Sequence, residues 1–190
     1  MEPERLEAFT DGVVAIIITI MVLEIRVPHG GDHAALRDDV PLLLAYVLSY
    51  VNVGIFWNNH HHMLHVTERV DGKVLWANLA LLFWLSLVPF VIRWLNESGF
   101  VALPTAAYGI VLACAAISYT VLERQIIAVN GRESGLARAV GTDRKGKLSI
   151  ALYLGAIVLA FVQTWIAIAL YVAVALLWLV PDRRIESLVK

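Results

Sequence analysis

Residues 5–24 read RLEAFTDGVVAIIITIMVLE, the stretch from which the rest of the fold is inferred. An apolar run extends from about Phe9 to Ile25, and Asp11 interrupts it near its start. A helix that spans a bilayer needs roughly 20 mostly apolar residues. We therefore predict a first transmembrane helix over residues 9–25.

The whole chain has the composition of a membrane protein. Of its 190 residues, 59% are hydrophobic and 16% are charged, and the mean hydropathy is +0.73. Soluble domains have about 45–50% apolar and about 25% charged residues, so an ordinary cytosolic enzyme and a disordered chain are excluded. A formal net charge of -1 provides no basic field for nucleic acid. The single Cys114 cannot form an intrachain disulfide.

Further apolar runs predict five more transmembrane helices. The last apolar block, residues 148–180, contains 33 residues, and one helix of that length would be about 50 Å long. Because a hydrocarbon core is about 30 Å thick, we predict a break near Gln163 and two short helices. The chain is thus an all-α membrane protein, a single domain over 1–190, with further spans at about 40–63, 74–95, 100–122, 148–162 and 165–180.

Charge counting favours six spans with both termini in the cytoplasm. This arrangement places three basic residues outside (Arg26, Arg37 and Arg93) and twelve inside, as the positive-inside rule requires. The acidic start, residues 1–4, is unlike a cleavable signal peptide. We interpret the basic segment 124–147 as a cytoplasmic linker, with a lipid-headgroup or partner site as the alternative. The inside residues are Arg5, Arg69, Lys73, Arg124, Arg132, Arg138, Arg144, Lys145, Lys147, Arg183, Arg184 and Lys190.

One side of the first helix carries a narrow stripe. At 100° per residue, Gly12, Ile16, Thr19 and Leu23 share that side, whereas Asp11 lies about 140° from Ile16. An acid inside a membrane helix usually faces protein or water. Asp11 is interpreted either as a snorkelling acid at the cytoplasmic end or as part of a buried polar cluster that joins this helix to its neighbours.

Partners for such a cluster occur at the ends of the next two spans. The second span ends with residues 56–65, FWNNHHHMLH, and the third begins with residues 75–79, LWANL. His61 and His65 have the i, i+4 spacing of a helical zinc pair, but no His-Glu-x-x-His pattern or obvious third ligand accompanies them. Interfacial histidines and a proton-sensitive element are the other interpretations, and we predict no metal site.

Four short patterns in the sequence resemble those of one protein family. Arg5-x-x-x-Phe9-Thr10-Asp11 is similar to the Arg-x-x-x-Phe-Ser-Asp motif of the TMEM175 family, which comprises the lysosomal potassium channel and its prokaryotic relatives. Trp57-x-x-His60-His61, Trp76-x-Asn78 and Pro89-Phe90 also resemble that family, so that the similarity covers about residues 5–90. Threonine replaces the motif's serine at position 10, and His62 stands where a basic residue is expected.

The resemblance implies a potassium-selective, leak-like cation channel in the bacterial plasma membrane. It implies a homotetramer of six-span chains in which the first helix lines a central pore. By this resemblance Ile16 and Leu23 form hydrophobic constrictions and Thr19 coordinates the permeant K⁺. A polar network would hold the pore helix, and its members would be Arg5, Phe9, Thr10, Asp11, His60, His61 and Asn78. The expected partners are other copies of the chain, lipid and K⁺, with no cofactor.

Two other classes of function compete with the channel. A proton-coupled membrane carrier would use Asp11 and the histidines at 60–62 as a relay, although one copy of the fold per chain gives little sign of alternating access. A histidine-based intramembrane metalloenzyme is the third class. Since no nucleophile–base pair or pair of catalytic carboxylates is evident in the sequence, we predict no catalytic residues and no enzyme.

Overall fold

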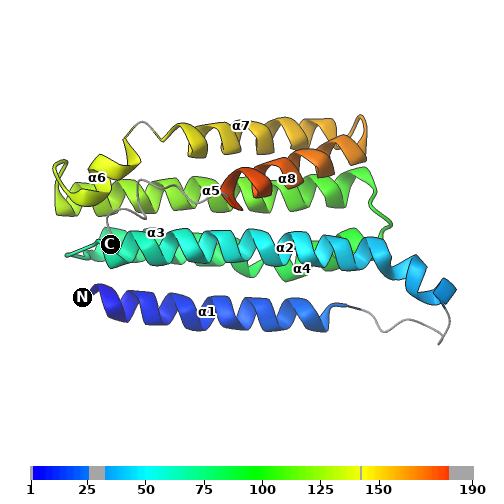
Figure 1. Ribbon diagram of the computed structural model, residues 1–190, viewed down its shortest axis with the longest axis horizontal. Coiled ribbons are helices and arrows are strands. Elements are labelled where there is room, and N and C mark those ends of the chain that lie inside the picture. The colour runs from blue at the N-terminus through cyan, green and yellow to red at the C-terminus, as the bar shows by residue number, and fades with distance from the viewer. Residues whose placement is uncertain (1, 26–32, 142, 180–190) are drawn as a thin grey trace.

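The computed structural model describes residues 2–25, 33–141 and 143–179. Every regular element in these ranges is a helix, and there are eight of them. Figure 1 shows the long helices lying nearly parallel in one elongated bundle. Their bounds are α1 Pro3–Leu23, α2 His33–His65, α3 Gly72–Ser86, α4 Val88–Glu97, α5 Ala102–Asn130, α6 Gly135–Val140, α7 Arg144–Leu159 and α8 Thr164–Leu179.

Within the described residues, four segments are long and apolar enough to cross a membrane. They are Pro3–Leu23, Val40–His65, Gly72–Glu97 and Ala102–Asn130, and they correspond to the first four predicted spans. The predicted break in the last apolar block is confirmed, because α7 ends at Leu159 and α8 begins at Thr164. Each of these two helices has 16 residues, about 24 Å of helix, so a membrane-spanning role for this pair stays a prediction.

The segment 124–147 differs from the linker that the sequence predicted. Helix α5 continues to Asn130, where Gly131 ends it with a φ of 96°. Two side chains then begin new helices, since Ser134 accepts the backbone N–H of Ala137 and Asp143 accepts that of Gly146. Such caps satisfy N–H groups that have no partner within the helix. Helices therefore account for more of the segment 124–147 than its composition indicated.

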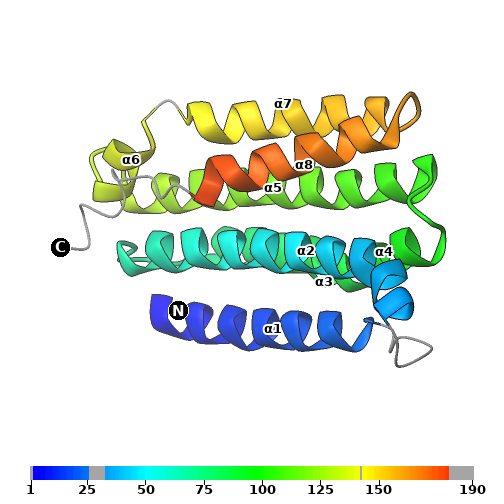
Figure 2. The same ribbon diagram turned by 45° about the vertical axis from the view of Figure 1, so that its right-hand side comes forward.

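The third apolar run is interrupted at Leu87, between α3 and α4. Pro89 stands in the first turn of α4, where its missing N–H costs little because that turn has no acceptor for it. A proline at this position commonly accompanies such a break. The N-terminus of α1 lies at the same end of the bundle as α6, and α8 runs back toward that end (Figures 1 and 2).

Close approach of α5 to α8 depends on a glycine. A Cβ atom on Gly109 would lie 2.1 Å from the hydroxyl oxygen of Tyr171. That hydroxyl donates to the backbone oxygen of Thr105 at 3.0 Å, and Tyr171 is 1% exposed. Any larger side chain at position 109 would displace a buried, hydrogen-bonded ring.

We therefore predict that Gly109→Ala destabilises the protein by about 1–3 kcal/mol, the usual cost of overpacking a core. The matched control is Gly155→Ala on α7, where an added Cβ meets nothing within 4 Å. That change is expected to be neutral or to stabilise the helix by up to about 1 kcal/mol. Thermal unfolding in detergent measures both variants, and equal effects would contradict the packing argument.

Candidate pore helix and its polar anchor

Helix α1 has one face packed against the bundle. Leu6, Val14, Ile17 and Met21 are each at most 3% exposed, and Thr10 is 1% exposed. These residues recur at three- and four-residue spacings, which keep them on one side of a helix. The buried side is therefore continuous from the beginning of α1 to its last turn.

The predicted stripe lies on the side of α1 that no other part of the described chain covers. Ile16 is 58% exposed and Leu23 is 80% exposed, and Gly12 and Thr19 are also exposed. The Thr19 hydroxyl donates to the backbone oxygen of Ile16 at 2.8 Å, with that of Ala15 at 3.0 Å as an alternative acceptor. Because the O–H is used in this way, the hydroxyl oxygen keeps its lone pairs as acceptors.

A buried amide joins α1 to α2 and α3. Asn78 on α3 donates from Nδ2 to the hydroxyl oxygen of Thr10 at 2.9 Å. Its Oδ1 lies 2.7 Å from Nε2 of His60, which places the histidine proton on Nε2. All three residues are at most 1% exposed. The Nδ1 atom of His60 is buried and has no hydrogen-bond partner among the described residues.

Two further contacts between α1 and α2 lie beside this amide. Trp57 donates its indole N–H to Oδ1 of Asp11 at 2.8 Å. His61 pairs through Nδ1 with a carboxylate oxygen of Glu7, and its ring stacks with Trp57 at 5.9 Å between centroids. Glu7 is not among the residues that the sequence predicted for the polar network. The helical spacing could have indicated it. Glu7 and Asp11 are four residues apart on α1, and their partners His61 and Trp57 are four residues apart on α2.

The hydrogen bonds thus bring together five of the seven residues expected in the polar network. Thr10, His60 and Asn78 form one chain of contacts, whereas Asp11 and His61 belong to the neighbouring contacts with Trp57 and Glu7. The structure does not join Arg5 and Phe9 to them. Both side chains are exposed, and within the described ranges neither makes a side-chain hydrogen bond or ion pair.

The opposite end of α1 is held by charge. A carboxylate oxygen of Glu24 lies 3.3 Å from Nη1 of Arg93 on α4. Arg93 also donates from Nε to Glu97 at 3.0 Å. The arginine side chain is 58% exposed, so this ion pair contributes little to stability. Helix α1 is therefore anchored by buried hydrogen bonds at one end and by an exposed ion pair at the other.

The histidines do not gather a metal-binding set within the part of the chain that the structure describes. No group of three or more His, Cys, Asp or Glu side chains there could hold a metal ion. The ring of His61 instead stacks with that of His65 at 6.2 Å between centroids.

Comparison with known proteins places the chain in a family. A family profile described as "Endosomal/lysosomal potassium channel TMEM175" matches residues 5–89. A protein of Chryseobacterium sp. (strain P1-3), named a potassium channel, is 50% identical over 190 residues, which are 100% of this chain and 99% of that protein. The chain belongs to the TMEM175 family.

A solved structure agrees with this assignment. It is described as the crystal structure of a lysosomal potassium-selective channel TMEM175 homolog from Chamaesiphon minutus. The match has a TM-score of 0.82 and 26% identity, and it covers 95% of this chain and 97% of that one. The human relative, named an endosomal/lysosomal proton channel, is 38% identical over 96 residues, which are 44% of this chain and 19% of that protein.

We predict that Asn78→Ala destabilises the protein by about 1–3 kcal/mol, because it leaves the buried Thr10 and His60 without their partner. The control is Asn58→Ala on α2, a partly exposed position where no side-chain hydrogen bond is found in the described chain. Chemical or thermal unfolding in detergent compares the two variants. Equal stability of Asn78→Ala and the parent would show that the amide does not anchor α1.

Proposed function

We propose that the protein is a potassium-selective, leak-like cation channel whose pore is lined by α1 from four identical chains. The observation that carries the proposal is the exposed stripe of Ile16, Thr19 and Leu23 on a helix whose other face is anchored to the bundle. Membership of the TMEM175 family and the full-length relative named a potassium channel support it.

The exposed stripe supports an assembly of several chains, and the family resemblance implies four. One copy of α1 cannot enclose a path for ions, and within one chain the stripe has no partner among the described residues. Four copies around an axis would turn the four stripes toward each other. Lipid would then contact the outer helices, which also expose many large apolar side chains.

The chemistry of the stripe fits a gated cation path. A ring of Ile16 side chains would form a narrow apolar constriction, and such constrictions gate by dewetting. A ring of Leu23 would form a second constriction two turns further along. Between them, four Thr19 hydroxyl oxygens would offer ligands to a partly dehydrated cation. Because K⁺ loses water more readily than Na⁺, few ligands suffice for a modest preference.

The polar anchor consists of the hydrogen bonds that join Thr10 to Asn78, Asp11 to Trp57, and Asn78 to His60. This anchor would fix the rotation of α1 about its own axis. Thr10 and Asp11 point to different partners, Asn78 and Trp57, so any turn of the helix lengthens at least one hydrogen bond. Interhelical hydrogen bonds in membranes contribute about 0.6–2 kcal/mol each. Together they would keep Ile16 directed at the axis. Arg5, on the same side as the stripe, would line the cytoplasmic mouth rather than join the anchor.

The proposed setting is the bacterial plasma membrane. The chain would cross it six times as one domain over 1–190, with both termini in the cytoplasm and the basic segment 124–147 inside. It would act through K⁺ permeation, without a cofactor and without catalysis.

A proton-coupled carrier is less well supported by the contacts. Asp11 bonds Trp57, whereas His60 bonds Asn78. In the described parts of the chain no hydrogen bond connects Asp11 to His60, His61 or His62, so a relay through these groups is interrupted. Saturable transport driven by a pH gradient and lost in Asp11→Asn would nevertheless establish the carrier and displace the channel proposal.

We predict that Ile16→Asn raises basal K⁺ flux, because an amide ring wets the constriction. Each 1.4 kcal/mol removed from the barrier corresponds to about a tenfold increase. The matched control is Val22→Asn, also on α1 and 47% exposed but about 120° from Ile16 around the helix. Flux into liposomes that contain purified protein measures both. Unchanged flux in Ile16→Asn, or single subunits counted by photobleaching in the same liposomes, would contradict the pore assignment.

We predict that Thr19→Ala lowers the preference for K⁺ over Na⁺, because it removes the only side-chain oxygen on the stripe between Ile16 and Leu23. Reversal potentials in planar bilayers under bi-ionic conditions report the permeability ratio. Thr19→Ser retains the hydroxyl and is expected to keep the ratio of the parent. A ratio that stays constant in Thr19→Ala would remove Thr19 from ion coordination.

A further inference from the structure

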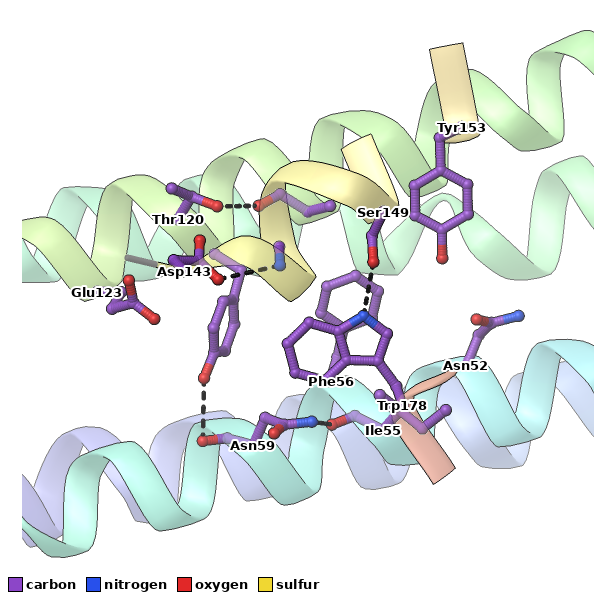
Figure 3. A pocket seen from close by; sticks show the side chains of 13 residues that line it. Asn52, Ile55, Phe56, Asn59, Thr120, Glu123, Asp143, Ser149, Tyr153 and Trp178 are labelled. Atoms are coloured by element: carbon purple, nitrogen blue, oxygen red, sulfur yellow. Dashed lines mark hydrogen bonds between the residues drawn. The ribbon is translucent and has the colours of Figure 1, made fainter. Parts of the chain in front are cut away.

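A separate cavity lies inside the bundle, away from α1. It is enclosed by α2, α5, α7 and the end of α8, and its volume is about 50 Å³. That space would hold a few water molecules or a ligand of a few heavy atoms. Figure 3 shows the side chains around it, with acids at one end and aromatic rings beside them. No residue of the stripe or of the polar anchor lines this cavity.

The acid end of the cavity contains a carboxylate with no hydrogen-bond or ion-pair partner among the described residues. Glu123 on α5 is 8% exposed and lines the cavity, yet it makes no hydrogen bond or ion pair within the described residues. Asp143 also lines it, and one of its oxygens accepts the backbone N–H of Gly146 at 3.0 Å. The like charge of Asp143 repels Glu123, whereas the opposite charge of the exposed Arg124 attracts it. A buried carboxylate is costly unless a cation or a donor compensates it.

The walls of the cavity are aromatic, and their polar tips are already engaged. The indole N–H of Trp178 donates to the hydroxyl of Ser149 at 2.8 Å. The Tyr119 hydroxyl donates to the backbone oxygen of Asn59 at 3.1 Å. These bonds leave the ring faces, rather than the polar tips, available to an occupant. Aromatic faces attract ammonium groups, and the ammonium of Lys145 already lies 5.4 Å from the ring centre of Trp178.

We propose that this cavity binds a small protonated alkylamine. The ammonium group would lie between Glu123 and the free oxygen of Asp143, and the short alkyl chain would contact Phe56 and Trp178. The two carboxylates supply the charge, the rings supply the apolar contact, and the volume limits the ligand to a few heavy atoms. Each subunit would carry such a site independently of the pore, at the end of the bundle where α7 begins.

The test uses the full-length purified protein and ethylammonium chloride as the probe, at constant ionic strength. Isothermal titration in detergent is expected to give saturable binding, and thermal unfolding is expected to shift upward with ethylammonium but not with ethanol, its neutral analogue. Glu123→Gln is expected to weaken binding about tenfold or more, because a charge-assisted contact is lost. The matched control, Glu133→Gln, removes an exposed acid at the same end of the bundle and is expected to bind as the parent does.

A second variant keeps the test decisive if Glu123→Gln does not fold. Trp178→Leu removes a wall of the cavity and retains both acids, and it is expected to weaken binding severalfold. Absence of saturable binding, equal affinity for K⁺ at the same site, or parent-like binding in both cavity variants would overturn the proposal. Because the readouts are binding and thermal shift, they do not depend on whether the protein conducts ions.

Discussion

The amide of Asn78 is the contact on which the arrangement of the first three helices depends. It is completely buried and uses both ends, one toward Thr10 on α1 and the other toward His60 on α2. In a hydrocarbon environment no water replaces a lost partner, so the three side chains satisfy each other or remain costly. The geometry of this one group therefore joins one side each of α1, α2 and α3 through buried hydrogen bonds.

The sequence predicted those features that follow from local chemistry. Long apolar runs identified the first four spans, and the length of the last block required a break before Thr164. Helical periodicity alone placed Ile16, Thr19 and Leu23 on one side of α1. Each of these features is set by residues that are contiguous in the sequence, which is why a single sequence was sufficient.

Features that depend on distant partners were harder to predict. The polar caps Ser134 and Asp143 begin helices inside a segment whose composition resembles a linker. In the sequence, Glu7 cannot be distinguished from an exposed acid. Its role depends on His61, with which it pairs in the fold. Arg5 belongs to a family pattern, but a regular helix turns it away from the buried contacts of Thr10. The burial of Glu123 could not be predicted from its neighbours in the sequence. It arises because residues of four helices converge around one cavity.

The unequal anchoring of α1 has a mechanical consequence. Buried hydrogen bonds hold α1 near Thr10, whereas its far end is held by the apolar packing of Met21 and by an ion pair between Glu24 and Arg93 that is exposed and weakened by salt. Leu23 lies 13 residues beyond Thr10, a lever arm of about 20 Å, whereas Ile16 lies at only about 9 Å. A tilt of about 5° would then move Leu23 by roughly 2 Å and Ile16 by less than about 1 Å. The same tilt of α1 about Thr10 would therefore displace Leu23 about twice as far as Ile16.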